Sequence, residues 1–292
     1  MANSIELAKK FLPIIDDIYK NASFTAQLDT PQMPGWFGGA NEIKVLKAST
    51  TGLGNYNRQT GYPGGDVTAT WETMKLSQER GKKINVDRMD DEETLGMTFG
   101  YVVGNFMRDH VIPELDAYRF SRYCTKAGGT ASGALDKETI LAAIDTAGKG
   151  MDEGEVPQDG RILFVNTNLK PALSEAIGRM LANESAVNTI VNNYNGMPIV
   201  YVNPGRFYSQ ITLNDGTSTY GFTKTATTGK DINFLIVRKD AVVQGVKFSL
   251  PKIFSPDVNQ EMDAWMFQFR NYHDAFVYEN KTKGIYAHIA AA

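Results

Sequence analysis

Apolar side chains recur at three- and four-residue steps between residues 90 and 126, and they are Leu95, Phe99, Val102, Phe106, Met107, Leu115 and Tyr118. This spacing predicts one long helix. At about 1.5 Å per residue it would extend about 50 Å, which suits an element that joins distant parts of a molecule. Asp90 and Glu93 are predicted to form a capping box at its start, and Gly128 ends the pattern. Pro113 removes a backbone donor inside the row, so we expect a kink or a break there.

The first 41 residues predict an arm that is partly helical and partly extended. Residues 4–20 place apolar side chains on one helical face, and the stretch after them has no regular periodicity. That stretch holds three candidates for contact with another subunit, Phe24, Trp36 and Phe37. Apolar side chains on an irregular segment are a liability on an isolated chain. They are either buried on a neighbouring subunit or folded back onto the chain's own core, and both interpretations stay open.

Residues 42–89 predict a projecting β-hairpin. The run EIKVLKAST is a strand, and a Gly-, Asn- and Tyr-rich stretch follows it. The runs VTATWETMKL and KKINVDR then alternate apolar and polar residues on either side of a turn at 78–81. A hairpin alone is marginal in water, so we expect this one to rest on another chain. The candidate contact residues are Tyr56, Tyr62, Trp71, Met74 and Leu76.

The second half of the chain mixes helix and strand patterns, so the predicted class is α+β. After a Gly-rich loop at 128–133, we expect a helix from about 136 to 147 and an irregular stretch before the buried strand RILFVN. A helix starting at Thr167 or Asn168, a second helix near 187–193 and the strand MPIVYVN complete a β-α-α-β block. Further strands are expected in residues 231–250 and in the aromatic-rich tail.

Composition narrows the function classes. The 292 residues carry a formal net charge of −3, which argues against a surface that grips phosphate backbones over most of its area. The single cysteine, Cys124, excludes an internal disulfide and is expected to be a buried, small hydrophobic side chain. No stretch is long and apolar enough to cross a bilayer, so we expect no membrane partner. The N-terminus also lacks the pattern of a secretion signal.

The usual motifs of catalytic, nucleotide and metal sites are absent from the sequence. His110 lies on or beside the apolar row of the long helix and is expected to be a core histidine. His273 and Asp274 are neighbours on a predicted strand, so their side chains should point to opposite faces and form no dyad. We therefore expect no enzyme, no cofactor and no metal ion.

In the order of its parts, the chain resembles the major capsid proteins of tailed bacteriophages, whose fold is named after the Hong Kong ninety-seven phage. The segments that carry the resemblance are the hairpin at 42–89, the helix at 90–126, the run RILFVNTNLKPALSEAI, the run GMPIVYVN and the tail MFQFRNYHDAFVYENKTKGIYAHI. The resemblance implies an N-terminal arm (1–41), an extended loop or E-loop (42–89), the spine helix and first part of a peripheral (P) domain (90–135), an axial (A) domain (136–250) and the closing strands of the P domain (251–292).

The resemblance also implies a function, namely a structural subunit that self-assembles into pentamers and hexamers of an icosahedral head enclosing double-stranded DNA. The implied partners are other copies of the chain, a portal, the packaged DNA and a separate scaffolding protein, since the chain begins almost directly with its arm. The implied location is the virion, after assembly in the host bacterial cytoplasm. We expect deletion of residues 1–30 to leave a folded subunit that cannot form shells.

Two alternatives stay open. An encapsulin-type cage has the same fold and holds a cargo enzyme in place of a genome. An α/β ligand-binding protein or enzyme would instead close the hairpin and the Gly-rich loops over a small molecule, although no convergent set of titratable residues supports it.

Overall fold

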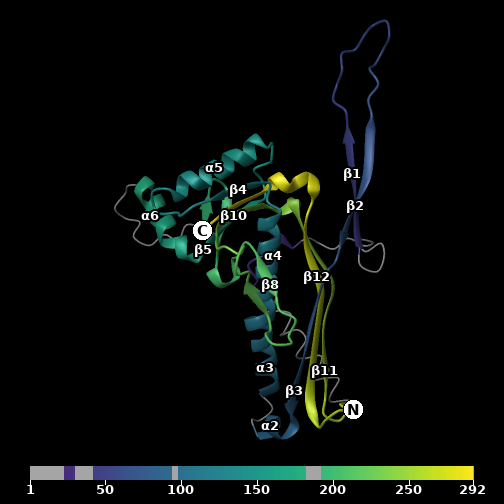
Figure 1. The fold of residues 1–292 in the computed structure, drawn as a ribbon, viewed down its shortest axis with the longest axis vertical. Coiled ribbons are helices and arrows are strands. Elements are labelled where there is room, and N and C mark those ends of the chain that lie inside the picture. Colours follow the sequence, from purple (N-terminus) through teal and green to yellow (C-terminus); the bar gives the residue numbers. More distant parts are fainter. Residues whose placement is uncertain (1–22, 30–41, 94–97, 182–191, 292) are drawn as a thin grey trace.

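The computed structural model describes residues 23–29, 42–93, 98–181 and 192–291. Figure 1 shows an elongated molecule in which a segmented helix runs beside a long, narrow sheet. A second sheet with its helices lies toward one end, and a hairpin projects beyond both. The architecture is mixed helix and sheet, as the sequence predicts.

A six-stranded sheet forms the core of the larger end. Its strands are, in spatial order, β4 (Gly129–Ser132), β13 (Ile285–Ile289), β10 (Ile232–Arg238), β5 (Arg161–Asn166), β7 (Met197–Val202) and β6 (Asn193–Tyr194). Helices α5 (Ile140–Glu153) and α6 (Lys170–Leu181) pack on one face through a cluster that includes Ile144, Leu173 and Phe234. The other face packs on the long helix, where the ring centroids of Phe120 and Phe164 lie 5.2 Å apart. Every residue of β5 is buried because the sheet is covered on both faces.

The long helix consists of α3 (Thr98–Phe106), the π turn η2 (Met107–Val111) and α4 (Ile112–Thr125), and the short helix α2 (Arg88–Glu93) precedes residues 94–97, which lie outside the described residues. Pro113 does not end the long helix, because in a π turn each carbonyl pairs with the N–H five residues on and can therefore pass over the missing donor. The predicted start was wrong by two residues. Helix α2 begins at Arg88, and the carboxylate of Asp87 accepts a hydrogen bond from the backbone N–H of Met89 at 2.9 Å.

A three-stranded antiparallel sheet runs beside α3, in the order β11 (Val242–Phe254), β12 (Ala264–Val277) and β3 (Gln78–Asp87). The turn predicted at 78–81 was wrong, since these residues begin β3, which pairs with β12 instead of returning along the hairpin. Gly81 permits this pairing, because a Cβ atom there would lie 2.9 Å from the carbonyl oxygen of Phe269.

The predicted hairpin is formed by β1 (Glu42–Thr50) and β2 (Val67–Lys75), which pair antiparallel across the excursion at 51–66. A second, short hairpin consists of β8 (Ile211–Leu213) and β9 (Phe222–Lys224). The short 3-10 turns are η1 (Ala26–Leu28), η3 (Thr167–Leu169), η4 (Pro204–Arg206), η5 (Lys239–Ala241) and η6 (Glu279–Gly284).

Pairing over long sequence distances accounts for the other differences. The segment 128–133, predicted to be a loop, contains β4, which pairs in parallel with β13. The two strands of the tail were both expected in the P domain, yet β12 and β13 belong to different sheets. Helix α5 extends to Glu153, into the stretch expected to be irregular. The helix predicted near 187–193 falls mainly outside the described residues.

Candidate subunit interfaces

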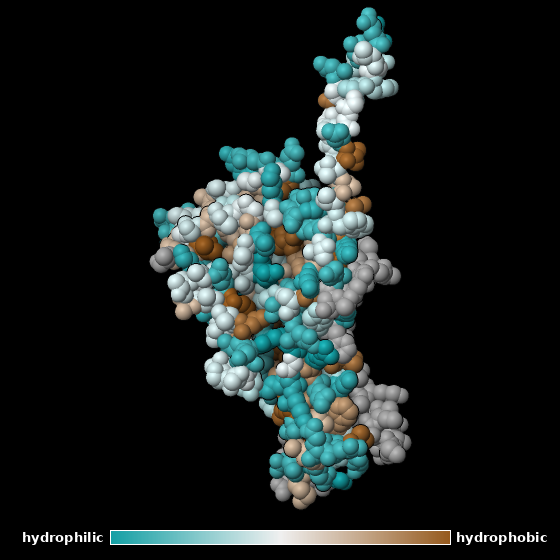
Figure 2. Space-filling view, turned by 45° about the vertical axis from the view of Figure 1, so that its right-hand side comes forward, coloured by the Kyte–Doolittle hydropathy of each residue, from teal (hydrophilic) through white to brown (hydrophobic). Residues whose placement is uncertain are grey.

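The projecting hairpin has two chemically different faces. Side chains alternate along a strand, and Leu46 lies opposite Trp71 in the register of β1 and β2. One face therefore carries an exposed apolar set, which we name the apolar hairpin face, made of Leu46, Ala48, Val67, Ala69 and Trp71. Leu46 is 52 %, Val67 71 % and Trp71 65 % exposed. Figure 2 shows the apolar patches along this narrow projection. Nothing within the described part of the chain covers them.

The base of the hairpin is packed on the chain's own core. Ile43, Met74 and Leu76 are buried in one cluster with Val243 and Phe276. The choice of Met74 and Leu76 as subunit-contact residues was therefore wrong, because both side chains face the core and are no more than 4 % exposed. Polar contacts support the packing, since Lys47 forms an ion pair with Glu279, whose backbone N–H donates to Glu72.

The tip of the hairpin presents two tyrosines. Tyr56 and Tyr62 are 59 % and 88 % exposed, and their rings make an edge-to-face contact with centroids 5.0 Å apart. Asn57 and Gly61 form a β-bridge between them, in which Gly61 has a φ of +83° that side-chain-bearing residues rarely adopt. Both tyrosines are available to a partner.

The described part of the arm is attached to α4 by a buried carboxylate. Asp116 is 0 % exposed. Its oxygens accept hydrogen bonds from the backbone N–H of Phe24 (3.0 Å) and from the hydroxyls of Ser23 (2.7 Å) and Thr25 (2.8 Å). Arg206 lies 3.4 Å from the same carboxylate. A buried ionised group requires such partners, so this set is a specific attachment point.

Of the three candidate subunit-contact residues in the arm, Phe24 lies within the described residues. Phe24 folds back onto the chain's own core, where it is partly buried and lies beneath the guanidinium of Arg206, 5.3 Å from the ring centroid. Trp36 and Phe37 lie outside the described residues.

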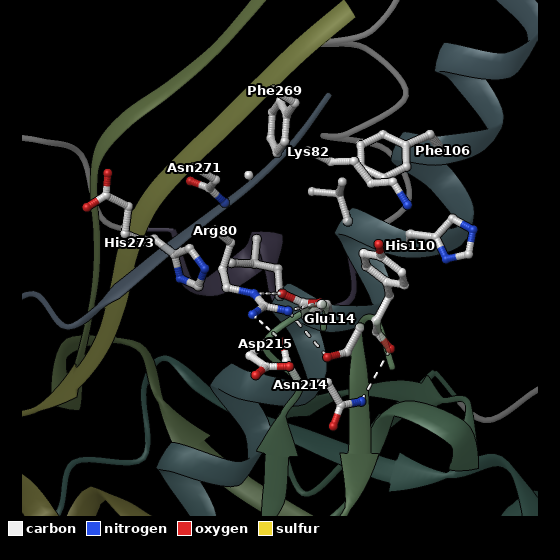
Figure 3. A pocket seen from close by; sticks show the side chains of 17 residues that line it. Arg80, Lys82, Phe106, His110, Glu114, Asn214, Asp215, Phe269, Asn271 and His273 are labelled. Atoms are coloured by element: carbon white, nitrogen blue, oxygen red, sulfur yellow. Dashed lines mark hydrogen bonds and ion pairs between the residues drawn. The ribbon is translucent and has the colours of Figure 1, made fainter. Parts of the chain in front are cut away.

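A pocket of about 440 Å³ lies where β3, the π turn and the loop joining β8 to β9 meet. Figure 3 shows Arg80 and Glu114 pointing toward one another at its edge. No sequence pattern singled out Arg80, Glu114, Asp116, Leu46 or Val67. An acidic residue inside an apolar helical row was an available signal for Asp116. The register that aligns Leu46 with Trp71 is a property of the folded hairpin.

Burial shifts the pKa values of two core side chains, Cys124 and His273. Cys124 is buried as predicted, and its burial raises the pKa of the thiol to about 12. Burial, with help from nearby arginines, lowers the pKa of His273 to about 3. Its neighbour Asp274 accepts hydrogen bonds from Tyr118 and Ser77, both at 2.7 Å. The prediction of a core position for His110 was wrong, because the π turn shifts the apolar row and leaves this side chain exposed.

Over the described ranges, no three His, Cys, Asp or Glu side chains gather closely enough to hold a metal ion. None of the helices in those ranges is long and apolar enough to cross a membrane.

Comparison with known proteins gives a likeness in structure. No family model matches the chain, and no curated protein matches it in sequence. A structure from Mycobacterium phage Che8 is similar with a TM-score of 0.62 and 14 % identity, covering 91 % of this chain and 90 % of that chain. The capsid structure of the Cyanophage P-SCSP1u has a TM-score of 0.60 and 11 % identity, with 87 % and 84 % covered. A virus-like particle from Pyrococcus furiosus has a TM-score of 0.55 and 10 % identity, with 97 % and 99 % covered.

These matches cover between 87 % and 97 % of this chain. The chain shares its overall architecture with phage capsid structures. The chain therefore has the fold of tailed-phage major capsid proteins.

Proposed function

We propose that this chain is a major capsid protein, the structural subunit of an icosahedral phage head. It self-assembles into pentamers and hexamers and encloses double-stranded DNA. The observation that carries the proposal is the apolar hairpin face, on a projection that has no core of its own. A two-stranded ribbon with Leu46, Val67 and Trp71 exposed is stabilised only when another surface covers it. In closed rings each subunit offers one surface to the next, so the same hairpin is buried in every copy.

The five-part organisation belongs to the proposal, with changes of boundary that follow the pairing of the strands. We assign the hairpin residues 42–76 to the E-loop, and β3 to the P domain because it pairs with β12. We assign β13 to the A domain because it pairs with β10. By the same criterion we assign β11 to the P domain because it pairs with β12, and β4 to the A domain because it pairs with β13. The arm and the spine helix keep the assignments that the resemblance implies.

The expected partners are further copies of the chain, a separate scaffolding protein, a portal and the packaged DNA. The expected location is the virion, after assembly in the host cytoplasm. The role is structural and requires no reaction. The fold shared with phage capsid structures supports these assignments.

An encapsulin-like cage is the second candidate. The similarity to a virus-like particle from Pyrococcus furiosus, at a TM-score of 0.55, does not favour a cage over a capsid. The two functions differ in contents, because a capsid encloses nucleic acid and a cage encloses a cargo protein. An α/β ligand-binding protein or enzyme would instead be a monomer that binds a small ligand saturably.

The test is to express the full chain alone and with its genomic neighbours, and to measure particle mass by size-exclusion chromatography with light scattering. Negative-stain microscopy of the same peak then gives the particle's shape. We expect closed shells, tubes, or free pentamers and hexamers. A monomer or dimer under every condition would contradict the proposal. Shells that co-purify with a protein cargo and contain no nucleic acid would favour the cage.

A further inference from the structure

The helix and the three-stranded sheet beside it each contain one irregularity, and both lie at the same level of the molecule. In the helix it is the π turn Met107–Val111. In the sheet it is a bulge, because β11 places one extra residue, Lys247, between the partners of His273 and Tyr272. The pocket lies between the two, since His110 and His273 both line it. Bulges and π turns are places where a strand or helix bends.

These irregularities separate two packed units. The lower unit in the view of Figure 1 consists of α3 and the part of the three-stranded sheet beside it. These pack through a cluster that includes Phe99, Phe267 and Phe269. The upper unit consists of α4 and the six-stranded sheet, which pack through a different cluster that includes Phe120 and Phe164. The apolar cores on the two sides are therefore distinct, and the connection between them passes through the irregular level.

Arg80 crosses this level from the lower unit to the upper one. It lies on β3 opposite Asn271, and its guanidinium makes a two-pronged ion pair with Glu114 of α4 at 2.6 and 3.1 Å. It also donates to the backbone carbonyls of Asn214 (2.6 Å) and Gly221 (3.3 Å), in the loop that joins β8 to β9. A planar guanidinium held by four such bonds fixes direction as well as distance.

The packing around this contact is incomplete. The pocket of about 440 Å³ beside Arg80 is lined by His273 and Asn271, which are 4 % and 2 % exposed. Nδ1 of His273 and Oδ1 of Asn271 have no hydrogen-bond partner within the described part of the chain. Buried polar atoms are normally paired, so a junction that leaves two of them unpaired is not held in one arrangement by close packing.

We propose that Arg80 is a clasp that sets the angle between the lower unit and the upper unit, and that the π turn and the bulge are the hinge on which this angle changes. The clasp consists of the Arg80 side chain and the four hydrogen bonds that it donates. Opening it releases the loop at 214–221 and α4 together, because Arg80 holds both. Within the proposed function, two angles would allow one chain to occupy pentamers and hexamers, and that consequence rests on the proposed function.

The test measures the angle in free subunits, so it does not depend on shell formation. Spin labels are placed on exposed lysines converted to cysteine, Lys252→Cys in the lower unit and Lys149→Cys in the upper unit, because Cys124 is buried. Pulsed dipolar spectroscopy then gives the distribution of the distance between the two labels. The chain with native Arg80 is expected to give one narrow distribution.

Arg80→Gln is expected to broaden this distribution or to add a second distance. Glu114→Gln should do the same from the other side of the contact, and it decides the matter if Arg80→Gln does not fold. The matched control is Arg270→Gln, which removes an arginine of β12 that pairs with Glu79 of β3 within the same sheet. Hydrogen exchange should rise in residues 107–112 and 211–224 in both clasp variants and stay unchanged in the control.

The proposal is overturned if both clasp variants give the same narrow distribution as Arg270→Gln. It is also overturned if the control broadens the distribution equally, because loss of any arginine would then explain the change. Neither result bears on whether the chain forms shells, which the particle-mass measurement decides separately.

Discussion

Leu46 and Trp71 lie directly opposite each other on the projecting hairpin, and both side chains are more than half exposed, at 52 % and 65 %. A cross-strand apolar pair normally stabilises a sheet by facing a core. Here the pair faces away from the chain's own core, which only the opposite face of the hairpin reaches. This relationship marks the surface that a neighbouring subunit is expected to cover.

Trp71→Ser should block assembly without unfolding the subunit, because it removes the largest side chain of the apolar hairpin face. The measurement is particle mass by light scattering, with thermal unfolding of the free subunit alongside. Thr70→Ala is the matched control, since Thr70 is exposed on the same strand but points to the other face. Normal shells from the Trp71 variant would show that the face is not an interface.

Met74→Ala should act on stability. Met74 is 4 % exposed and packs with Phe276, and truncation of a buried Met costs about 2–5 kcal/mol in the free energy of unfolding. Urea denaturation of the free subunit measures this loss. Tyr62→Ala is the comparison, because this side chain is 88 % exposed and its loss should leave the urea midpoint unchanged. Equal midpoints for the two variants would contradict the assignment of Met74 to the core.

Asp116→Asn should destabilise the subunit by about 1–3 kcal/mol, because the amide places an NH2 donor where a fully buried carboxylate oxygen accepts hydrogen bonds. The neutral amide also replaces a charged acceptor with a weaker one for Ser23 and Thr25. Urea denaturation is again the measurement. The control is Asp109→Asn on the same long helix, where the carboxylate is exposed and pairs with Arg108 at the surface. A loss below about 1 kcal/mol for Asp116→Asn would contradict the role of this attachment point.

The attachment at Asp116 determines how a deletion of the arm affects folding. Residues 1–22 precede it, whereas Thr25 and Leu28 are buried in it at 0 % and 2 % exposure. Deletion of residues 1–22 should therefore leave the urea midpoint nearly unchanged and impair shell formation. Deletion of residues 1–30 should in addition lower the midpoint, because it exposes Asp116 and part of the core. A longer deletion with an unchanged midpoint would restore the original expectation that the whole segment is dispensable for folding.

Acid should destabilise the fold through His273. The unfolded chain takes up a proton on this imidazole near pH 6.5, whereas the folded chain, with a pKa of about 3, does not. Protons therefore favour the unfolded state, and stability should fall by about 1.4 kcal/mol for each pH unit between 6.5 and 3. Urea denaturation at pH 7, 6 and 5 measures the slope. His273→Gln should reduce it by this amount, and His110→Gln, at an exposed position, should not. An unchanged slope in the His273 variant would show that its imidazole is accessible to protons in the fold.

Local patterns predicted much of this molecule. The alternation in residues 42–50 and 67–75 predicted the hairpin, and the apolar run at 161–166 predicted the buried strand β5. The apolar row predicted a helix over 90–126, and residues 98–125 are helical as predicted. Each of these signals depends on the side-chain period of one element. The order of the elements was enough to indicate the capsid fold, which the structural comparisons show.

Tertiary pairing decided the rest. Met74 and Trp71 lie three residues apart on one strand, and both are large apolar side chains that could be buried in the core or at an interface. Only the packing of β2 against Val243 and Phe276 buries the first and leaves the second exposed. In the same way, Gly129–Ser132 becomes a strand because β13 supplies a partner more than a hundred residues later in the chain. A one-dimensional pattern specifies which face of an element is apolar, whereas the surface that meets this face, in the same chain or in the next, is a property of the three-dimensional arrangement.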